Sequence, residues 1–185
     1  MQLIIKAKRV GGKSLYLRDI REDDAKFVFD LRSNPEKNRY LSVTSDRLED
    51  QTNWIRDYKS KHDQASFIIC DKFDTKLGCM RMYDPIDRSY RWGSWLMING
   101  LGPLVVIEAT LLMYAYGKFL GFSEARIDVR QANTYVWSFH EKFSSATLVK
   151  QDDTDRYYVV SADKINKVLA RYSNFLSSPF LVETF

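Results

Sequence analysis

The sequence predicts an α/β (α+β) fold with a mixed, mostly antiparallel central sheet and helices on both of its faces. First, strand-like and helix-like stretches alternate along the chain. Second, three consecutive strand candidates with turn residues between them favour an antiparallel meander. Third, no repeat, low-complexity tract or linker interrupts the 185 residues, so we expect a single domain over 1–185.

The first half of the chain predicts a strand, two helices and three further strands. Residues 14–20 alternate in polarity like a strand. Residues 22–32 carry acidic side chains in the first turn and apolar ones at helical spacing, and this helix ends before Asn34 and Pro35. A second amphipathic helix follows at 47–61. The three strands of the meander are expected at 65–72, 76–84 and 89–98.

The second half begins with a long apolar helix and ends with a short amphipathic one. The apolar helix runs from Pro103 to about Leu120. The elements after it are a strand at 124–130, a helix at 133–143, strands at 145–150 and 156–161 around the polar turn 151–155, and the amphipathic stretch 162–171. We expect the remaining apolar tail, 172–185, to dock on the body of the domain or on a partner.

Composition and charge exclude several classes of protein. With 45% hydrophobic and 14% aromatic residues, the chain has the composition of a packed globule. Its net charge is +4, but acidic and basic residues are interspersed, which argues against a nucleic-acid-binding arm and indicates an anionic ligand at most. No apolar run is long enough for a membrane span, and residues 1–12 lack the features of a secretory signal, so we expect a cytoplasmic protein.

The two cysteines are expected to be structural. Cys70 and Cys79 lie in neighbouring apolar runs and could face each other across a hairpin. In a reducing compartment they are expected to be buried thiols without chemistry.

A glycine pair precedes the long apolar helix. Gly100 and Gly102 flank Leu101, and Pro103 follows directly. Residues without Cβ let backbone N–H groups approach an anion closely, and the helix dipole adds a favourable positive end. The pattern predicts an anion-binding loop; the alternative is a plain turn with Pro103 at the first helical position.

The same helix carries one buried acid. Glu108 is its only acidic residue, and apolar residues lie on every side of it. A carboxylate in such surroundings is expected to be paired or protonated. We expect a structural partner on the meander, such as Arg81 or Arg91, rather than a direct catalytic role.

The order of elements over roughly residues 14 to 160 resembles the acetyl-CoA-dependent N-acetyltransferase superfamily, known as the GNAT fold. The Gly100–Gly102 loop is similar to the family's pyrophosphate-binding signature, which lies between its fourth strand and its long helix. Glu108 followed six residues later by YAY, and Asn133 followed by FHEKF at 139–143, resemble motifs of bacterial members that act on sugar nucleotides, of the pseudaminic-acid-pathway type.

The resemblance implies that acetyl-CoA is the co-substrate and that no metal is needed. The cofactor-binding residues that it implies are Trp95, Leu96, Met97, Gly100, Leu101, Gly102, Asn133 and Lys142. Two departures from the family pattern bear on cofactor affinity. The Arg or Gln that usually opens the signature is Met97 here, and the glycine–aromatic pair that usually ends the second helix is replaced by Ser144 and Ser145.

The resemblance also implies a catalytic role for His140. Seven residues after the asparagine that opens this helix, the family usually has a tyrosine that protonates the departing thiolate, and this chain has His140 there. An imidazole with a pKa near ~6.5 can supply that proton at neutral pH. The alternative is a partly exposed helix residue beside Glu141 and Lys142. The other histidine, His62, lies in a charged helix end and is expected to face water.

Asp128 is the second catalytic candidate. It falls where the similar sugar-nucleotide enzymes carry an acid near the substrate amine. On the strand 124–130 it shares one face with Arg126 and Arg130. We therefore expect an ion-paired carboxylate that orients the substrate and is a weak base.

The N-terminal third is expected to hold the acceptor. Residues 30–42 resemble the segment after the first helix of the pseudaminic-acid-pathway enzymes, and Gln51 takes the place of a histidine found there. The acceptor-site residues implied by this resemblance are Arg32, Asn34, Tyr40, Gln51 and Trp54. Aromatic rings could stack on a sugar or base, and Arg32 or Arg39 could pair with a nucleotide diphosphate.

Three functions fit the sequence. The first is an acetyltransferase that acts by direct transfer on a nucleotide-linked amino sugar for surface polysaccharide. The second is the same fold acetylating a protein N-terminus or a small amine, and the third is a non-enzymatic basic binding domain. We favour the first, with no nucleic-acid partner, and leave a homodimer open.

Overall fold

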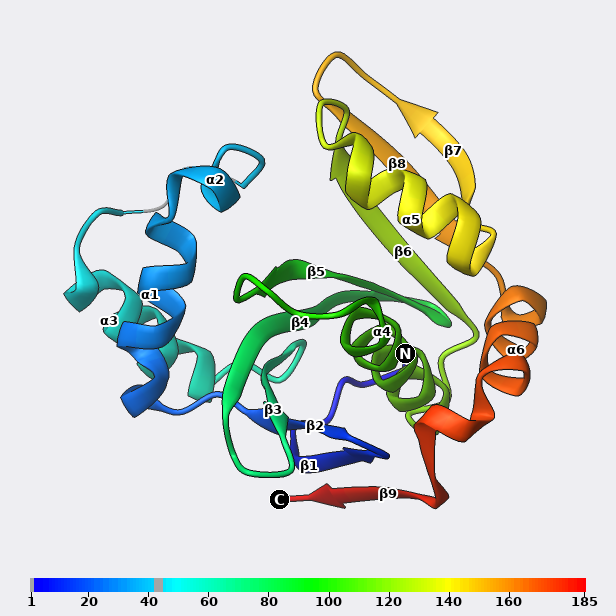
Figure 1. Cartoon of the computed structure of the whole chain (residues 1–185), viewed down its shortest axis with the longest axis horizontal. Helices are drawn as coiled ribbons and strands as arrows, with labels where there is room; N and C mark the ends of the chain where they lie inside the picture. The colour runs from blue at the N-terminus through cyan, green and yellow to red at the C-terminus, as the bar shows by residue number, and fades with distance from the viewer. Residues whose placement is uncertain (1, 42–44) are drawn as a thin grey trace.

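The computed structural model describes residues 2–41 and 45–185, and its described strands form one nine-stranded sheet (Figure 1). The strand order is β7-β8-β6-β5-β4-β3-β2-β1-β9. The strands are β1 (Ala7–Gly12), β2 (Leu15–Asp19), β3 (Ala65–Asp71), β4 (Lys76–Ile86), β5 (Ser89–Met97), β6 (Glu124–Arg130), β7 (Thr147–Gln151), β8 (Asp155–Val160) and β9 (Leu176–Thr184). Neighbouring strands are antiparallel except β5 and β6, which are parallel.

Helices cover both faces of the sheet. The helices are α1 (Ala25–Ser33), α2 (Pro35–Asn38), α3 (Leu48–Lys59), α4 (Pro103–Phe119), α5 (Thr134–Ser144) and α6 (Ala162–Arg171), with 3-10 turns at Glu22–Asp24 and Ser173–Phe175. Apolar residues of α4, α5 and α6 pack into one core, and those of α1 and α3 pack into a second core on the opposite face. The predicted mixed sheet with helices on both faces is confirmed.

Three elements were not predicted. The chain begins its fold with strand β1, forms the four-residue helix α2 after Asn34, and ends with strand β9. The tail 172–185 docks on the body as expected, but it does so as a strand: Val182 pairs with Val10 and Leu181 with Gly11, so that β9 extends the sheet beyond β1. Because this pairing joins the two ends of the chain, a local sequence window does not reveal it.

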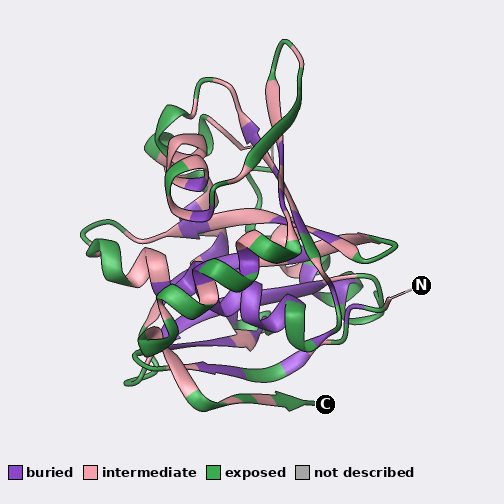
Figure 2. Ribbon diagram, turned by 90° about the vertical axis from the view of Figure 1, so that its right-hand side faces the viewer, coloured by how far each residue is buried: buried purple, intermediate pink, exposed green. Residues whose placement is uncertain are grey.

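Helix α4 lies at the centre of the molecule, where the buried residues concentrate (Figure 2). Gly102 is its N-cap and Pro103 occupies its first turn, as the sequence predicts. Glu108 on this helix is 3% exposed, and its Oε1 accepts the backbone N–H groups of Ser14, at 2.6 Å, and Leu15, at 2.9 Å. The expectation of an arginine partner on the meander was wrong, because Glu108 faces the β1–β2 turn instead.

The remaining sequence expectations concern the surface and the thiols. Cys70 and Cys79 are free and buried, and His62 is exposed, as expected. None of the helices formed by residues 2–41 and 45–185 combines the length and the apolar character needed to cross a membrane. Ser42, at the end of the 30–42 segment discussed above, lies outside the described residues.

Candidate active site

The parallel strands β5 and β6 spread apart at the centre of the sheet (Figure 1). Their pairing joins Ser89–Arg91 of β5 to Glu124–Arg126 of β6. From Trp92 to Met97, β5 pairs with β4 but no longer with β6 in the described part of the chain. Backbone groups on the β6 side of β5 are therefore available to a ligand in the opening between the strands.

A β-bulge distorts β5 where it leaves β6. Cys79 of β4 pairs with Leu96 of β5, and Arg81 of β4 pairs with Gly93 of β5. One residue lies between the paired positions on β4 and two lie between them on β5, so β5 carries one extra residue. Ser94 in this bulge has φ 48°, in the left-handed region that non-glycine residues rarely adopt. Bulges of this kind redirect backbone and side chains beside binding sites.

The loop between β5 and α4 presents open space to a ligand. Gly100 has φ +80°, which favours glycine, and a Cβ added at Gly100 or Gly102 would meet nothing within 4 Å. Gly102, by contrast, has an ordinary extended conformation with φ −72° and ψ 160°. The loop therefore exposes backbone at the N-terminus of a buried helix, where N–H groups and the helix dipole favour an anion.

A groove of about 660 Å³ runs between the beginning of α4 and the length of α5. Its lining residues are Pro103, Val106, Ile107, Thr134, Tyr135, Trp137, Ser138, Phe139, Lys142 and Phe143. It is mostly apolar and lies beside the glycine loop at the α4 end. Lys142, predicted as a cofactor residue, lies in its wall.

Asn133, another predicted cofactor residue, caps helix α5. Its side-chain oxygen accepts the backbone N–H of Val136 at 3.4 Å. This is the usual use of an asparagine at a helix N-cap. The cap accounts for the side-chain oxygen and leaves the amide N–H groups for a ligand.

His140 is buried in an aromatic cluster. It is 1% exposed, and its ring lies 5.3 Å from the Trp92 ring, 6.1 Å from the Trp95 ring and 5.3 Å from the Phe139 ring, measured between centroids. The alternative of a partly exposed helix residue was therefore wrong. Burial lowers the pKa of His140 from 6.5 to about 3, so the imidazole is neutral at physiological pH.

Three ring nitrogens in this cluster are buried without a hydrogen-bond partner among the described residues. They are Nδ1 of His140 and Nε1 of Trp92 and Trp95. Buried polar atoms in native proteins are nearly always hydrogen-bonded, so an orphaned set calls for an explanation. Trp92 and Trp95 belong to β5 and His140 to α5, so the set lies at the contact between this strand and this helix.

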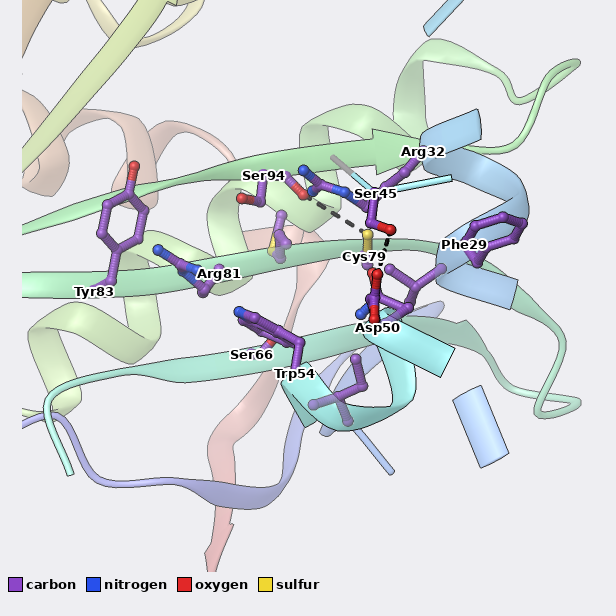
Figure 3. Close-up of a pocket in the computed structure, with 14 residues that line it drawn as sticks. Phe29, Arg32, Ser45, Asp50, Trp54, Ser66, Cys79, Arg81, Tyr83 and Ser94 are labelled. Carbon is purple, nitrogen blue, oxygen red and sulfur yellow. Dashed lines mark hydrogen bonds between the residues drawn. The ribbon is translucent and has the colours of Figure 1, made fainter. Parts of the chain in front are cut away.

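A second cavity, of about 460 Å³, lies on the α1 and α3 side of the sheet (Figure 3). Of the predicted acceptor residues, Arg32, Gln51 and Trp54 line it. Asn34 and Tyr40 do not belong to its described wall. The Asn34 side chain instead caps α2 by accepting the backbone N–H of Glu36 at 2.9 Å.

Arg81 is a site residue that the sequence reasoning missed in this role. It projects from β4 into the same cavity, with its guanidinium 4.3 Å from the centre of the Tyr83 ring and 5.8 Å from that of Trp54 (Figure 3). Its Nε is buried and has no hydrogen-bond partner in the described part of the chain. Burial lowers the pKa of Arg81 and of Arg32, and the charge of Arg32 lowers that of Arg81 further.

The cavity therefore holds two cations with little local compensation. Within the described part of the chain, neither Arg32 nor Arg81 forms an ion pair with a carboxylate. The one acid in the wall, Asp50, accepts a hydrogen bond from Ser45. Both arginines are partly buried, and a partly buried guanidinium without an acid partner has unfavourable desolvation that an anionic ligand would relieve.

Asp128 lies on the open face of β6, on the same side of the sheet as this cavity. Its ion-pair partner is Arg91 of β5, at 3.1 Å, whereas the flanking Arg126 and Arg130 pair with Asp84 and Asp155. Burial raises the pKa of Asp128, and the Arg91 charge only partly offsets this. The expected ion-paired carboxylate is present, with Arg91 as its partner, and its strength as a base stays a prediction.

Tyr83 connects the cavity to Asp128. It lines the cavity, and its pKa is raised by burial and, next, by the charge of Asp128. A Cβ added at Gly93, in the β5 bulge, would lie 3.4 Å from the Tyr83 hydroxyl. The cavity wall thus reaches the bulge and the carboxylate through one phenol.

No cluster of three or more His, Cys, Asp or Glu side chains suited to a metal ion occurs among residues 2–41 and 45–185. The two cavities, the opening between β5 and β6, and the glycine loop all offer space to a ligand. They lie around the same part of the sheet, with the apolar groove on one face and the cationic cavity on the other.

The chain matches one protein family and many solved structures. Residues 14–144 match the family described as acetyltransferase (GNAT) domain. A structure of apo FdhC, described as a nucleotide-linked sugar GNAT, is 31% identical, with a TM-score of 0.81 over 91% of this chain and 98% of that chain. A comparison with curated protein sequences found no match.

More distant structures share the fold. A GCN5-related N-acetyltransferase from Brucella melitensis is 14% identical, with a TM-score of 0.75 over 97% of this chain and 92% of that chain. A variant of SpeG spermidine N-acetyltransferase from Vibrio cholerae is 12% identical, with a TM-score of 0.70 over 83% of this chain and 96% of that chain.

Proposed function

The chain belongs to the GNAT acetyltransferase family and is an acetyl-CoA-dependent N-acetyltransferase, and we propose that its acceptor is the amine of a nucleotide-linked amino sugar. Membership in this enzyme family argues against the third hypothesis, a non-enzymatic basic binding domain. The proposal places the reaction in the cytoplasm, in the biosynthesis of surface polysaccharide. Its chemistry follows from the two cavities and the opening between them.

The donor side of the site is the groove between α4 and α5. The Gly100–Gly102 loop and the first turn of α4 offer backbone N–H groups to the pyrophosphate, and the space beside both glycines is open. The apolar walls of the groove suit the pantetheine arm, with Lys142 and the amide of Asn133 at its edge. This fit supports Trp95, Leu96 and Met97 as the strand segment that faces the thioester.

Acetyl-CoA supplies the activated acetyl thioester when it is bound. A backbone N–H on β5, in the segment Trp95–Met97 that has left β6, would donate a hydrogen bond to the thioester carbonyl oxygen, where negative charge develops. The carboxylate of Asp128, with its raised pKa, would accept the proton that the acceptor amine loses. Positioning both substrates supplies most of the rate enhancement in such a direct transfer.

His140 assists the leaving thiolate in this proposal. Because its pKa is about 3, the ring carries no proton to give as an imidazolium at neutral pH. A neutral imidazole N–H can still donate a hydrogen bond to the sulfur, in a buried setting where such bonds are strong. We therefore propose His140 as a hydrogen-bond donor to the leaving thiolate, which then takes its proton from solvent.

The observation that carries the choice of acceptor is the presence of Arg32 and Arg81 in one cavity, neither of them ion-paired with a carboxylate among the described residues. A diphosphate offers the anionic oxygens that two guanidinium groups bind well, and Trp54 offers a face for a base or sugar ring. A polyamine or a cationic peptide would meet two like charges there, which disfavours the hypothesis of an enzyme that acetylates a protein N-terminus or a small amine. FdhC, whose description names a nucleotide-linked sugar, supports the same class of acceptor.

A panel of acceptors tests the proposal. We expect release of free CoA thiol from acetyl-CoA with a UDP- or dTDP-linked aminodeoxy sugar, and little or none with spermidine or with a peptide N-terminus. Mass spectrometry of the product identifies the acetylated amine. Turnover of spermidine or peptide at a rate equal to or above that of the nucleotide sugars would overturn the assignment.

A further inference from the structure

The glycine loop receives a cation from a distant part of the chain. Lys37, on the four-residue helix α2, reaches across to the end of β5, where its Nζ donates to the backbone carbonyl of Met97 at 2.6 Å. It also donates to Oδ1 of Asn99 at 2.5 Å. Asn99 directly precedes Gly100, so this ammonium lies at the beginning of the loop that leads into α4.

The position of Lys37 coincides with a departure of this chain from its family. The phosphate-binding signature usually opens with Arg or Gln at the position that Met97 occupies here. Methionine has no charge and no hydrogen-bond donor to offer a phosphate. Lys37 places an ammonium on the carbonyl of that same residue, 60 positions away in sequence.

A purely structural role leaves part of this arrangement unexplained. An ammonium has three N–H donors, and the two contacts to Met97 and Asn99 use two of them. Both acceptors are neutral, so the positive charge of Lys37 has no compensating carboxylate in the described part of the chain. A positive charge held on Asn99, at the start of the loop that leads into α4, acts in the same sense as the helix dipole in favouring an anion.

We infer that Lys37 is a cofactor-binding residue: it supplies to the pyrophosphate of acetyl-CoA the side-chain donor that Met97 lacks. Its third N–H and its charge act together with the backbone N–H groups of the Gly100–Gly102 loop. Helix α2, which has no buried residue of its own, is thereby fixed next to the donor site. The inference concerns only the donor, so it holds whether or not the acceptor is a nucleotide sugar.

The test compares two donors that share the thioester but differ in their phosphates. Binding of acetyl-CoA and of S-acetylpantetheine, which carries no phosphate, is measured by calorimetry for the native chain and for Lys37→Met. We expect the Kd for acetyl-CoA to rise about two- to fivefold, as for loss of one partly exposed ionic contact, and the Kd for S-acetylpantetheine to stay unchanged. Raising the salt concentration should shrink the difference between the two chains.

Two further variants keep the test specific. Lys37→Arg retains the charge and should restore most of the acetyl-CoA affinity. Lys26→Met is the matched control: it removes an exposed lysine of the neighbouring helix α1, paired with Asp30, and should leave both affinities unchanged. An unchanged acetyl-CoA affinity in Lys37→Met would overturn the inference. An equal loss of affinity for both donors would also overturn it, because Lys37 would then act only as a tether for the loop.

Discussion

Replacing Arg81 with methionine should separate function from stability. The variant keeps the unbranched stem but removes the guanidinium from the cavity that it shares with Arg32. If this group binds a phosphate of the acceptor, its loss removes a charge-assisted hydrogen bond worth about 1.5–3 kcal/mol. The KM for the nucleotide sugar should then rise roughly 10- to 150-fold, while the KM for acetyl-CoA stays unchanged.

The same change should cost the fold little. The buried Nε of Arg81 has no partner among the described residues, and such an orphaned donor costs about 1–3 kcal/mol. The cation–π contacts with Tyr83, at 4.3 Å, and with Trp54, at 5.8 Å, offset about 0.5–2 kcal/mol of that. The two effects nearly cancel, so we expect the free energy of unfolding in urea to stay within about 1–2 kcal/mol of the native value, or to increase.

Two comparison variants complete this experiment. Arg81→Lys keeps the charge but loses the planar fork, so its acceptor KM should fall between those of the native chain and the methionine variant. Arg88→Met removes an exposed arginine of the β4–β5 turn and should change neither KM. An unchanged acceptor KM in Arg81→Met would refute the reasoning, and so would a loss of more than about 3 kcal/mol of stability, which would make Arg81 a structural residue.

The remaining predictions concern the donor loop, the buried histidine and the buried acid. Gly102→Glu should fold normally, because the backbone at Gly102 is unstrained and its surroundings are open, and it should weaken acetyl-CoA binding measured by calorimetry. Gly102→Gln separates the effect of bulk from that of charge. Equal affinity in the native chain and both variants would contradict phosphate binding at this loop. His140→Phe removes the proposed hydrogen-bond donor to the leaving thiolate and should lower kcat roughly 10²-fold with cofactor affinity kept. His140→Tyr should recover much of the rate because a phenol also donates a hydrogen bond, and a full-rate Phe variant would end the catalytic assignment. The pKa of His140 is lowered in the folded state, so below pH ~6.5 the unfolded chain binds a proton that the folded chain does not. The native chain should therefore lose about 1.4 kcal/mol of unfolding free energy per pH unit as the pH falls below ~6.5. Urea titrations at several pH values should show this loss in the native chain and not in His140→Phe. Glu108→Leu should destabilise the fold by about 2–5 kcal/mol because it leaves the N–H groups of Ser14 and Leu15 without their acceptor. Glu108→Gln keeps an oxygen at this position and should destabilise the fold less. Equal losses in the two variants would show that packing rather than hydrogen bonding is involved.

Local patterns in the sequence predicted the elements that later proved to frame the site. Acidic first turns, apolar spacing and the glycine–proline sequence before α4 are all short-range signals, and the helices and most strands lie where those signals place them. Strand β9 escaped because its partner, β1, lies at the other end of the chain, and β1 pairs with β9 as well as with its neighbour β2. Helix α2 escaped because it is only four residues long and has no buried face.

The site itself was predictable only in part. Gly100, Gly102, Arg32 and Trp54 stand in segments with a recognisable pattern, and the structure places them at the loop or in the cavity. Arg81 is different, since a charged residue in an alternating strand is ordinarily turned to solvent. Its burial depends on α3 and on Trp54 above it, which the strand's own pattern does not contain.

The histidine illustrates the same limit on a helix. Glu141 and Lys142 beside His140 suggested a solvent-facing turn, yet the ring points into the aromatic cluster of Trp92 and Trp95. Neighbours in sequence lie about 100° apart around a helix, so the polarity of adjacent residues says little about which side is buried. The face was decided by the packing of α5 against β5.

The most direct test of the central claim is the ratio of two specificity constants. At saturating acetyl-CoA, kcat/KM is measured for a dTDP- or UDP-linked aminodeoxy sugar and for the same amino sugar without its nucleotide. If Arg32 and Arg81 bind the diphosphate, two charge-assisted contacts of about 1.5 kcal/mol or more each should raise kcat/KM of the linked sugar at least about 100-fold, because remote binding energy positions the amine. Equal values for the linked and the free sugar would contradict the account.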